Sequence, residues 1–408
     1  MRQKTVRKVL LVFITAVISL LTAGCWDARE LQDRSFVLAA AIDTVDAGTK
    51  PGKGDSTSNA ETFIQLNGSK KYRLSLQVYK LAGGGGGEES GGGGKKEPSK
   101  TYVISNTGQS IFEMVRDMLG QSSKGLFWEH VQCIIISEAA VKEAGLGPIL
   151  DFFRRDPEMR WRIRVMITPG EARKLIEFQP PSGEPGAIYL NGLLRNHPRN
   201  LHVPAARTDL GYISQYLDTK QVVIIPVIVK SGDVVKAGGA AVFKKDKFAG
   251  YLDEKEVEGM KFIYGSEKSG IITLECKDHP GQLVAFELFT HDTRLKAHAD
   301  GDNIYFVLDI MMRGNLGEVT CSMEHDTTDE KYLREAEVAF AEEVKRVVFY
   351  SHQKSQRLNV DFLHLGAVLK KDEPKAWERV KDRWDEIYPT VPLIVSVNVS
   401  IRNVGEHK

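Results

Sequence analysis

Hydrophobic and polar residues alternate along many short segments of the chain, and this alternation predicts β-strands that bury one face. Residues 395–403 are the clearest case, because Val395, Val397 and Val399 alternate with serine and asparagine. Residues 35–43 form a nearly continuous apolar run, which predicts a buried strand. Further strands are expected at 73–80, 101–106, 130–137, 160–167, 221–230, 238–245, 247–252 and 270–277, with two long ones within 283–314.

Other segments place apolar residues three or four positions apart, which predicts amphipathic helices. One such helix is expected over 109–121 and a longer one over about 329–355. Thr168-Pro169-Gly170-Glu171 has the form of a capping box with proline at the first helical position, so a further helix is expected to begin there. Shorter helices are expected at 27–33, 137–145 and 147–155 and within 360–389.

These elements predict an α+β protein made of three mixed α/β domains with antiparallel-rich sheets. An N-terminal α/β domain is expected over 25–200, with a flexible glycine-rich loop at 82–99. A mostly β middle domain is expected over 206–281 and an α+β domain over 282–408. Residues 1–24 precede these domains as a cleaved signal peptide of the lipoprotein type.

The evidence for that signal peptide is a basic start, a short apolar run over 9–21 and small residues before Cys25. Thirteen apolar residues span only about 20 Å as a helix, too short for a stable membrane crossing. Small residues directly before a cysteine resemble a lipobox, in which the thiol is lipidated and becomes the first mature residue. The alternative is an ordinary signal peptide with a cysteine nearby. Thr22 departs from the aliphatic residue that is usual at its position.

Composition limits the function classes. The chain has 408 residues, of which 42% are hydrophobic, and its formal charge is +1. Four basic residues lie in the signal peptide, so the mature chain has 51 basic and 54 acidic residues and a net charge of −3. Neither value suggests the concentrated basic surface of a nucleic-acid binder, and no nucleic-acid partner is expected.

Three cysteines remain besides Cys25. Cys133 and Cys276 lie in apolar, strand-like segments, and no CxxC spacing or paired-cysteine framework includes Cys321. Buried free thiols are the favoured interpretation, and one disulfide among the three residues is left open.

The sequence contains no GxSxG, HExxH, Walker-type loop or clustered metal-ligand spacing, so we expect no enzymatic activity, no metal and no cofactor. His291 and His298 are seven apart on a predicted strand, which puts them on opposite faces as surface histidines. Three carboxylates, at Asp151, Asp156 and Glu158, lie among arginines and are interpreted as a solvated salt-bridge turn.

Trp377 and Trp384 are seven apart on one face of a predicted helix. Such a pair packs in a core more often than it cages a ligand, but if exposed it would form a partner-docking surface. An arginine-rich segment over 154–164 invites comparison with membrane-binding sequences. Arg162 and Arg164 alternate with Ile163 and Val165, however, and this favours the solvent face of a strand.

Several of these segments, taken in order, resemble the Ger(x)C family of spore-germination lipoproteins. The resemblance covers nearly the whole chain. Its residues are Gly24-Cys25-Trp26-Asp27, Glu30-Leu31, Ile42-Asp43, His130, Ile134 to Ser137, Arg155-Asp156-Pro157, Gly239 to Lys244, Gly250, Leu252, Gln353-Lys354, Asp361, Gly366, Trp377, Trp384, Ile401-Arg402 and Gly405. Thr22 and the size of the glycine-rich insertion depart from the family pattern.

The resemblance implies a three-domain α/β protein that is anchored by lipid on Cys25 to the outer face of the spore inner membrane. It implies the C subunit of a nutrient germinant receptor, which acts with membrane-embedded A and B subunits and carries no catalytic residues. The alternative function is a membrane-tethered solute-binding or envelope lipoprotein. A deep polar pocket or a tightly bound small ligand would favour that alternative.

Overall fold

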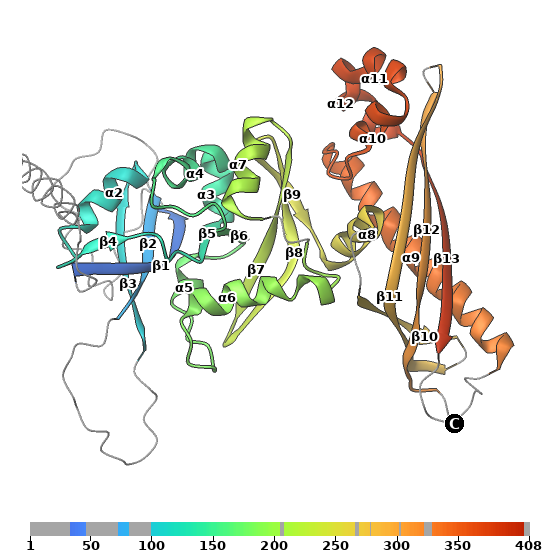
Figure 1. The fold of residues 1–408 in the computed structure, drawn as a ribbon, viewed down its shortest axis with the longest axis horizontal. Coiled ribbons are helices and arrows are strands. Elements are labelled where there is room, and N and C mark those ends of the chain that lie inside the picture. Colours follow the sequence, from blue (N-terminus) through green and yellow to red (C-terminus); the bar gives the residue numbers. More distant parts are fainter. Residues whose placement is uncertain are drawn as a thin grey trace, which may run out of the picture.

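Two β-sheets lie one after the other along the long axis of the molecule, with helices packed against both (Figure 1). The structure is a computed structural model, and it describes residues 33–45, 72–80, 99–204, 208–265, 269–277, 279–301, 303–321 and 329–403. Among these residues no helix combines the length and apolar composition needed to cross a bilayer.

The first sheet has nine strands in the order β3-β2-β1-β5-β6-β7-β8-β9, with β4 paired to β1. Strands β1, β5, β6 and β7 run parallel in the centre, and antiparallel pairs flank them on both sides. The strands are β1 Arg34–Thr44, β2 Tyr72–Tyr79, β3 Thr101–Gly108, β4 Gly125–Phe127, β5 Cys133–Ser137, β6 Arg164–Thr168, β7 Val222–Ser231, β8 Val234–Lys244 and β9 Lys247–Leu252.

Helices cover both faces of this sheet, which explains why β1 and β5 are apolar on both sides. Alternate residues of these strands therefore enter two separate hydrophobic clusters. One face packs against α2 Ile111–Met118, α3 Glu138–Ala144, α4 Leu146–Arg155 and α7 Leu210–Asp218. The other face packs against α5 Arg173–Ile176 and α6 Gly186–Arg195, which the short 3-10 helix η3 His197–Arg199 follows.

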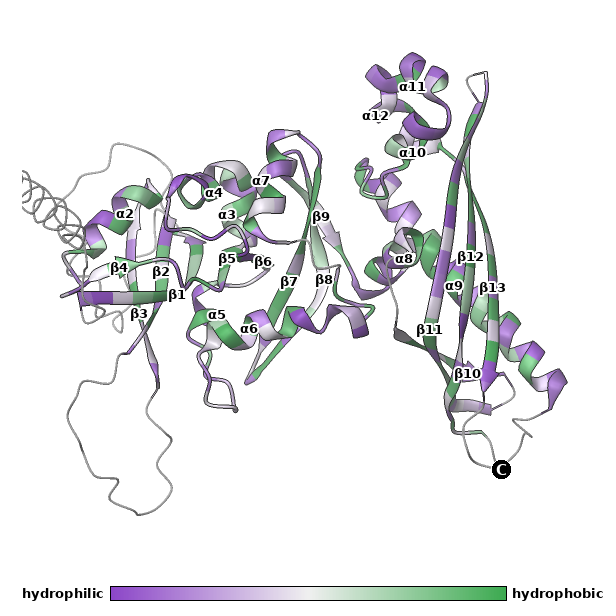
Figure 2. Cartoon of the chain, in the orientation of Figure 1, coloured by the Kyte–Doolittle hydropathy of each residue, from purple (hydrophilic) through white to green (hydrophobic). Residues whose placement is uncertain are grey.

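The second sheet has the order β10-β11-β12-β13, and the long helix α9 lies across one face of it. Figure 2 shows hydrophobic and hydrophilic bands alternating along α9, because only one side of the helix faces the sheet. Its elements are α8 Glu254–Tyr264, β10 Gly270–Cys276, β11 His279–Asp300, β12 Asn303–Val319, α9 Glu330–Leu358, α10 Leu365–Asp372, α11 Pro374–Val380, η4 Lys381–Arg383, α12 Trp384–Ile387, η5 Tyr388–Thr390 and β13 Leu393–Asn403.

The predicted fold class is confirmed: the chain is an α+β protein with mixed, antiparallel-rich sheets. Most predicted strands and the long helix also occur within a few residues of their expected bounds. The lipobox lies outside the described residues. So do the helix expected over 27–33 and the glycine-rich loop over 82–99, except for the last residue of each.

Two corrections concern local structure. Helices α6, α7 and α8 were not predicted, and α8 lies in a segment that was interpreted as mostly β. The capping box expected at 168–171 is wrong, because the helix starts only at Arg173 and its side-chain cap comes from elsewhere. The Asp43 carboxylate accepts hydrogen bonds from the backbone N–H groups of Ala172 and Arg173, at 2.7 and 3.0 Å.

A third correction concerns the cysteines. Cys276 and Cys321 form a disulfide, which joins the end of β10 to the segment after β12. The expectation of free thiols was therefore wrong for these two residues, and the disulfide that the sequence left open is present. Cys133 is buried and free, as expected, and burial raises the pKa of its thiol to about 12.

The segment expected to form a separate middle domain contributes to both sheets. Strands β7, β8 and β9 continue the first sheet, whereas β10 belongs to the second. Strand β8 also has each face in a different core: Ala241 and Phe243 pack with the N-terminal helices, and Ala240 and Val242 pack with the C-terminal core. The division into three domains at 206 and 281 stays a prediction.

Candidate functional site

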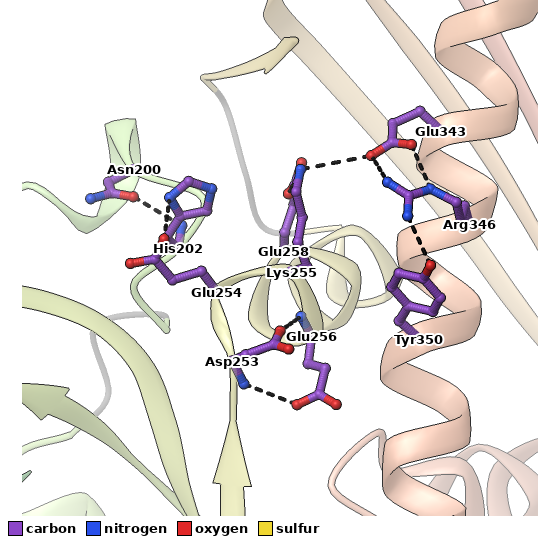
Figure 3. Close-up of polar contacts among 10 residues, drawn as sticks. All are labelled: Asn200, His202, Asp253, Glu254, Lys255, Glu256, Glu258, Glu343, Arg346 and Tyr350. Atoms are coloured by element: carbon purple, nitrogen blue, oxygen red, sulfur yellow. Dashed lines mark hydrogen bonds and ion pairs between the residues drawn. The ribbon is translucent and has the colours of Figure 1, made fainter. Parts of the chain in front are cut away.

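Helix α8 lies between the two sheets, and polar contacts connect it to residues on both sides (Figures 1 and 3). The helix begins with a capping box, in which the Asp253 side chain accepts from the Glu256 N–H at 2.7 Å and the Glu256 carboxylate accepts from the Asp253 N–H at 2.9 Å. It ends at Tyr264, and the following residue, Gly265, adopts the left-handed conformation that favours glycine. The position of α8 makes it the candidate site for communication between the two halves.

Three charged residues of this eleven-residue helix are buried, namely Glu256, Glu258 and Lys261. Charged side chains are seldom fully buried unless they are paired, because desolvation of an unpaired charge is costly. Each of these three buried charges therefore needs a charged or hydrogen-bonding partner. The partners come from both sides of the junction.

The Lys261 ammonium binds the N-terminal half of the chain. Its three N–H donors face three backbone carbonyls: His197 at 3.1 Å, Asn200 at 2.8 Å and Val203 at 2.9 Å. The side chain is fully buried. Lys261 thus fastens the segment after α6 to α8, across about 60 residues of sequence.

Glu258 faces the C-terminal side, and a chain of charges continues from it to α9 (Figure 3). Lys255 Nζ lies 2.8 Å from a Glu258 carboxylate oxygen and 3.7 Å from one of Glu343. Arg346 donates to both oxygens of Glu343, at 2.6 and 2.7 Å, and to the Tyr350 hydroxyl at 2.8 Å. The buried Glu258 charge is therefore linked through Lys255 to a paired arginine on α9.

The first turn of α8 carries the remaining pairs. Glu256 lies 3.2 Å from Lys354 and 3.6 Å from Arg357, both on α9. Glu254 turns the opposite way, toward Lys236 on β8 and toward His202, whose Nδ1 lies 3.5 Å from its carboxylate. One turn of helix thus makes ion contacts with both halves of the chain.

Gly259 sets the closest approach between α8 and α9. A Cβ atom at this position would lie 2.0 Å from the Val347 carbonyl oxygen and 3.0 Å from Cβ of Ser351. Only a residue without a side chain allows the two helices to pack this closely. The ion pairs above depend on that spacing.

A second cluster surrounds Asp361 and contains both predicted tryptophans. The Asp361 carboxylate accepts from the N–H groups of Leu365 and Gly366, at 2.8 and 2.7 Å, and from the Trp384 indole at 3.2 Å. Burial raises the pKa of Asp361, and these hydrogen bonds oppose the rise. Four residues of the C-terminal sequence pattern are thereby brought together, because Gly366 also lies against the Trp377 ring.

The sequence predicted that the tryptophan pair lies on one continuous helix, and this is wrong. Trp377 belongs to α11 and Trp384 to α12, with the 3-10 turn η4 between them. The two rings nevertheless meet edge to face, 5.7 Å apart. Trp384 is buried and Trp377 is half-buried, so the docking role of the pair stays a prediction that concerns mainly Trp377.

Of the three carboxylates that were predicted to form a salt-bridge turn, only Asp151 forms an ion pair within the described residues, whereas Asp156 and Glu158 accept from backbone N–H groups. Arg155 donates to both oxygens of Asp151, at 2.8 and 2.9 Å. Glu158 accepts from the Trp128 N–H at 3.1 Å, which the sequence did not indicate. Across the residues that the structure describes, no group of three or more His, Cys, Asp or Glu side chains is arranged to hold a metal ion.

His291 is not the surface residue that was expected. It is half-buried on β11 beside Phe262, and burial lowers its pKa to about 4. His352 on α9 is 5% exposed, and burial lowers its pKa to about 4 as well. His298 stacks on Tyr305 with ring centroids 5.1 Å apart.

These buried imidazoles predict that acid destabilises the fold. Below pH 6.5 the unfolded chain binds a proton at His352, whereas the folded chain does not until about pH 4. Stability is therefore lost as the pH falls from 6.5 to 4, and at pH 5 we expect a loss of about 2 kcal/mol from this residue. Unfolding free energies of the wild type and of His352→Phe, measured at pH 7 and pH 5, test this. An identical pH dependence in both proteins would contradict it.

The α8 cluster was missed from the sequence, although one signal for it was readable. Asp253 and Glu256 have the spacing of a capping box, and Val257 and Met260 follow at helical spacing. Nothing local indicates that Lys261 is buried, because its three acceptors lie 58 to 64 residues earlier in the chain.

Comparison with known proteins adds a family context to this geometry. Residues 27–230 match the family model "Spore germination protein N-terminal domain", and residues 238–405 match "Spore germination B3/ GerAC like, C-terminal". Two proteins of Bacillus subtilis (strain 168) are similar over nearly their full lengths. Spore germination protein YndF is 28% identical, with 100% of both chains covered, and spore germination protein KC is 25% identical, with 98% of this chain and 97% of the relative covered.

One solved structure has a similar fold. The crystal structure of the GerBC protein superposes with a TM-score of 0.56 and covers 93% of this chain and 100% of that chain, at 18% sequence identity. At this identity the likeness concerns the fold alone.

Proposed function

The chain belongs to the spore germination family defined by these N-terminal and GerAC-like C-terminal domains, and we propose that it is the C subunit of a nutrient germinant receptor. In this proposal the protein is not an enzyme. It is held by lipid on Cys25 at the outer face of the spore inner membrane, where it acts with membrane-embedded A and B subunits. A role in spore germination follows from the family itself; the anchor, the partners and the location are the proposal.

The observation that carries the proposal is the order and coverage of the two family matches. Together they include nearly all of the chain, and relatives named as spore germination proteins align from end to end. The boundary between the matches falls within 231–237, at the hairpin between β7 and β8. Both family domains therefore contribute strands to one sheet, which supports a single working unit.

The anchor is tested by Cys25→Ala. A diacyl lipid gives stable attachment, whereas a chain without lipid has no comparable hydrophobic anchor, so we expect the variant to leave the membrane fraction of spores. The nutrient response of those spores should fall to the level of spores without the protein. Cys133→Ala is the matched control, because that thiol is buried in the first sheet. Normal membrane retention and normal germination of the Cys25 variant would contradict the proposal.

The partners are tested separately. Affinity capture of the tagged protein from solubilised spore membranes should recover multi-spanning membrane proteins, identified by mass spectrometry. Trp377 is the half-buried tryptophan of the predicted pair, so we place one partner contact there. Trp377→Ala should reduce the recovery by more than it reduces the amount of folded protein, which also falls because the ring packs on Trp384. Recovery of no multi-spanning protein would count against a receptor subunit.

A further inference from the structure

A cavity of about 660 Å³ lies between α2 and α4 in the N-terminal half. None of the described residues that line it belongs to α8. Its volume is in the range of sites that hold small molecules. Residues from β2, α2, α4 and the turn after α4 line it. The proposed receptor function does not use this cavity.

Two phenylalanines form its apolar wall. The rings of Phe112 on α2 and Phe152 on α4 have centroids 6.0 Å apart, and the Phe112 side chain is 53% exposed. Ile111, Ile149 and Pro148 extend this surface. A large aromatic side chain left this exposed at the mouth of a cavity is suited to contact with an apolar ligand.

Two polar groups at the cavity have unused hydrogen-bonding capacity. The Arg116 guanidinium lies 5.0 Å from the centroid of the Phe112 ring, and no acidic side chain of the described residues pairs with it. The amide nitrogen of Gln109 is buried and has no hydrogen-bond partner in the structure. Both groups are donors, but only the exposed Arg116 guanidinium can be reached from the cavity, and it suits an acceptor with negative charge.

The other charged groups of the cavity are Asp151, Arg155 and Asp156. Arg155 and Asp151 neutralise each other through two hydrogen bonds. One oxygen of Asp156 accepts from the Glu158 N–H at 2.9 Å. Asp156 has no ion-pair partner among the described residues, so it would favour a cationic ligand, whereas Arg116 favours an anionic one.

We propose that this cavity binds a small organic anion with an apolar body, whose carboxylate pairs with Arg116 while its apolar part packs against Phe112 and Phe152. This inference does not depend on the proposed receptor function. It rests on the residues that line the cavity.

Three probes of nearly equal shape test the charge preference: 3-phenylpropionate, 3-phenylpropanamide and 3-phenylpropylamine. Binding is measured by saturation-transfer NMR and calorimetry on the full chain in bilayer nanodiscs. We expect the carboxylate to bind about tenfold more tightly than the amide, the effect of one hydrogen bond to a charged group. The amine should bind weakest.

Two variants then locate the site. Arg116→Gln should reduce carboxylate affinity to that of the amide and leave amide affinity unchanged, whereas Phe112→Ala should weaken both probes. Arg160→Gln is the control, because Arg160 is exposed and lies outside the cavity lining. Equal affinity for all three probes, strongest binding of the amine, no binding at millimolar concentration, or carboxylate binding that Arg116→Gln does not change would each overturn the proposal.

Discussion

Replacement of Gly259 by alanine is expected to destabilise the protein more than any other single-methyl change at the junction. The new Cβ would lie 2.0 Å from the Val347 carbonyl oxygen and 2.6 Å from its carbonyl carbon, well inside van der Waals contact. These are backbone atoms in the middle of α9, so they cannot turn aside as a flexible side chain would. The helices must therefore separate, and we expect a loss of about 3 kcal/mol or more in unfolding free energy.

The measurement is thermal and chemical unfolding of the purified chain, with Gly192→Ala as the matched control. Gly192 is also a glycine inside a helix, but a Cβ there would meet nothing within 4 Å. Alanine at that position is expected to be neutral or to stabilise by about 0.5–1 kcal/mol. Similar unfolding of the Gly259 and Gly192 variants would show that α8 and α9 are not packed as tightly as the structure indicates.

The strands and the long helix could be predicted because their signals are local. The alternation of Val395, Val397 and Val399 marks β13, and the spacing of Phe340, Val344 and Val347 marks the buried side of α9. Burial on one or both faces leaves such a pattern in the sequence itself. These elements make up much of both sheets and of the C-terminal core.

The contacts that place these elements against one another left no comparable signal. Asp43 caps a helix that starts 130 residues later. The residues next to that helix therefore carry no sign of the side chain that caps it. The disulfide of Cys276 and Cys321 depends on two strand ends that meet only in the folded sheet. In the Asp361 cluster, the residues were recognised as a sequence pattern, but their contacts required the turn that brings α10 against α12.

The junction itself shows why domain boundaries are difficult to infer from sequence here. The boundaries predicted from composition divide segments that are mostly β from segments that mix helices and strands. Strand β8, however, contributes residues to two hydrophobic cores, which such a boundary does not reveal. Any displacement of the C-terminal half relative to the N-terminal sheet would therefore disturb Ala240 and Val242 directly. Under the receptor proposal, α8 and β8 are the elements through which one half would respond to the other.

Lys261→Met tests whether α8 connects the two halves. We expect it to lower the unfolding free energy by a large amount, as Gly259→Ala does. Methionine keeps the length of the side chain but removes the three donors, so the carbonyls of His197, Asn200 and Val203 lose their shared partner. Each buried carbonyl left without a donor costs about 1–3 kcal/mol of unfolding free energy. Small movements that let water reach some of these carbonyls reduce this cost, so we expect the unfolding free energy to fall by about 3–4 kcal/mol in all. The loss should appear first as local opening of the segment over 197–203, since all three carbonyls that Lys261 binds belong to it.

Hydrogen–deuterium exchange of that segment separates this result from general destabilisation. In Lys261→Met, amides over 197–203 should exchange faster while those of β5 in the sheet centre keep their protection. Lys255→Met is the matched control on the same helix: it removes the ion-pair partner of the buried Glu258 carboxylate and the contact with Glu343 of α9, so it should also destabilise the protein but leave 197–203 protected. Unchanged exchange over 197–203 in the Lys261 variant would mean that the buried ammonium does not hold the two halves together. The charged contacts of α8 with α9 would then have to be considered separately from the N-terminal sheet.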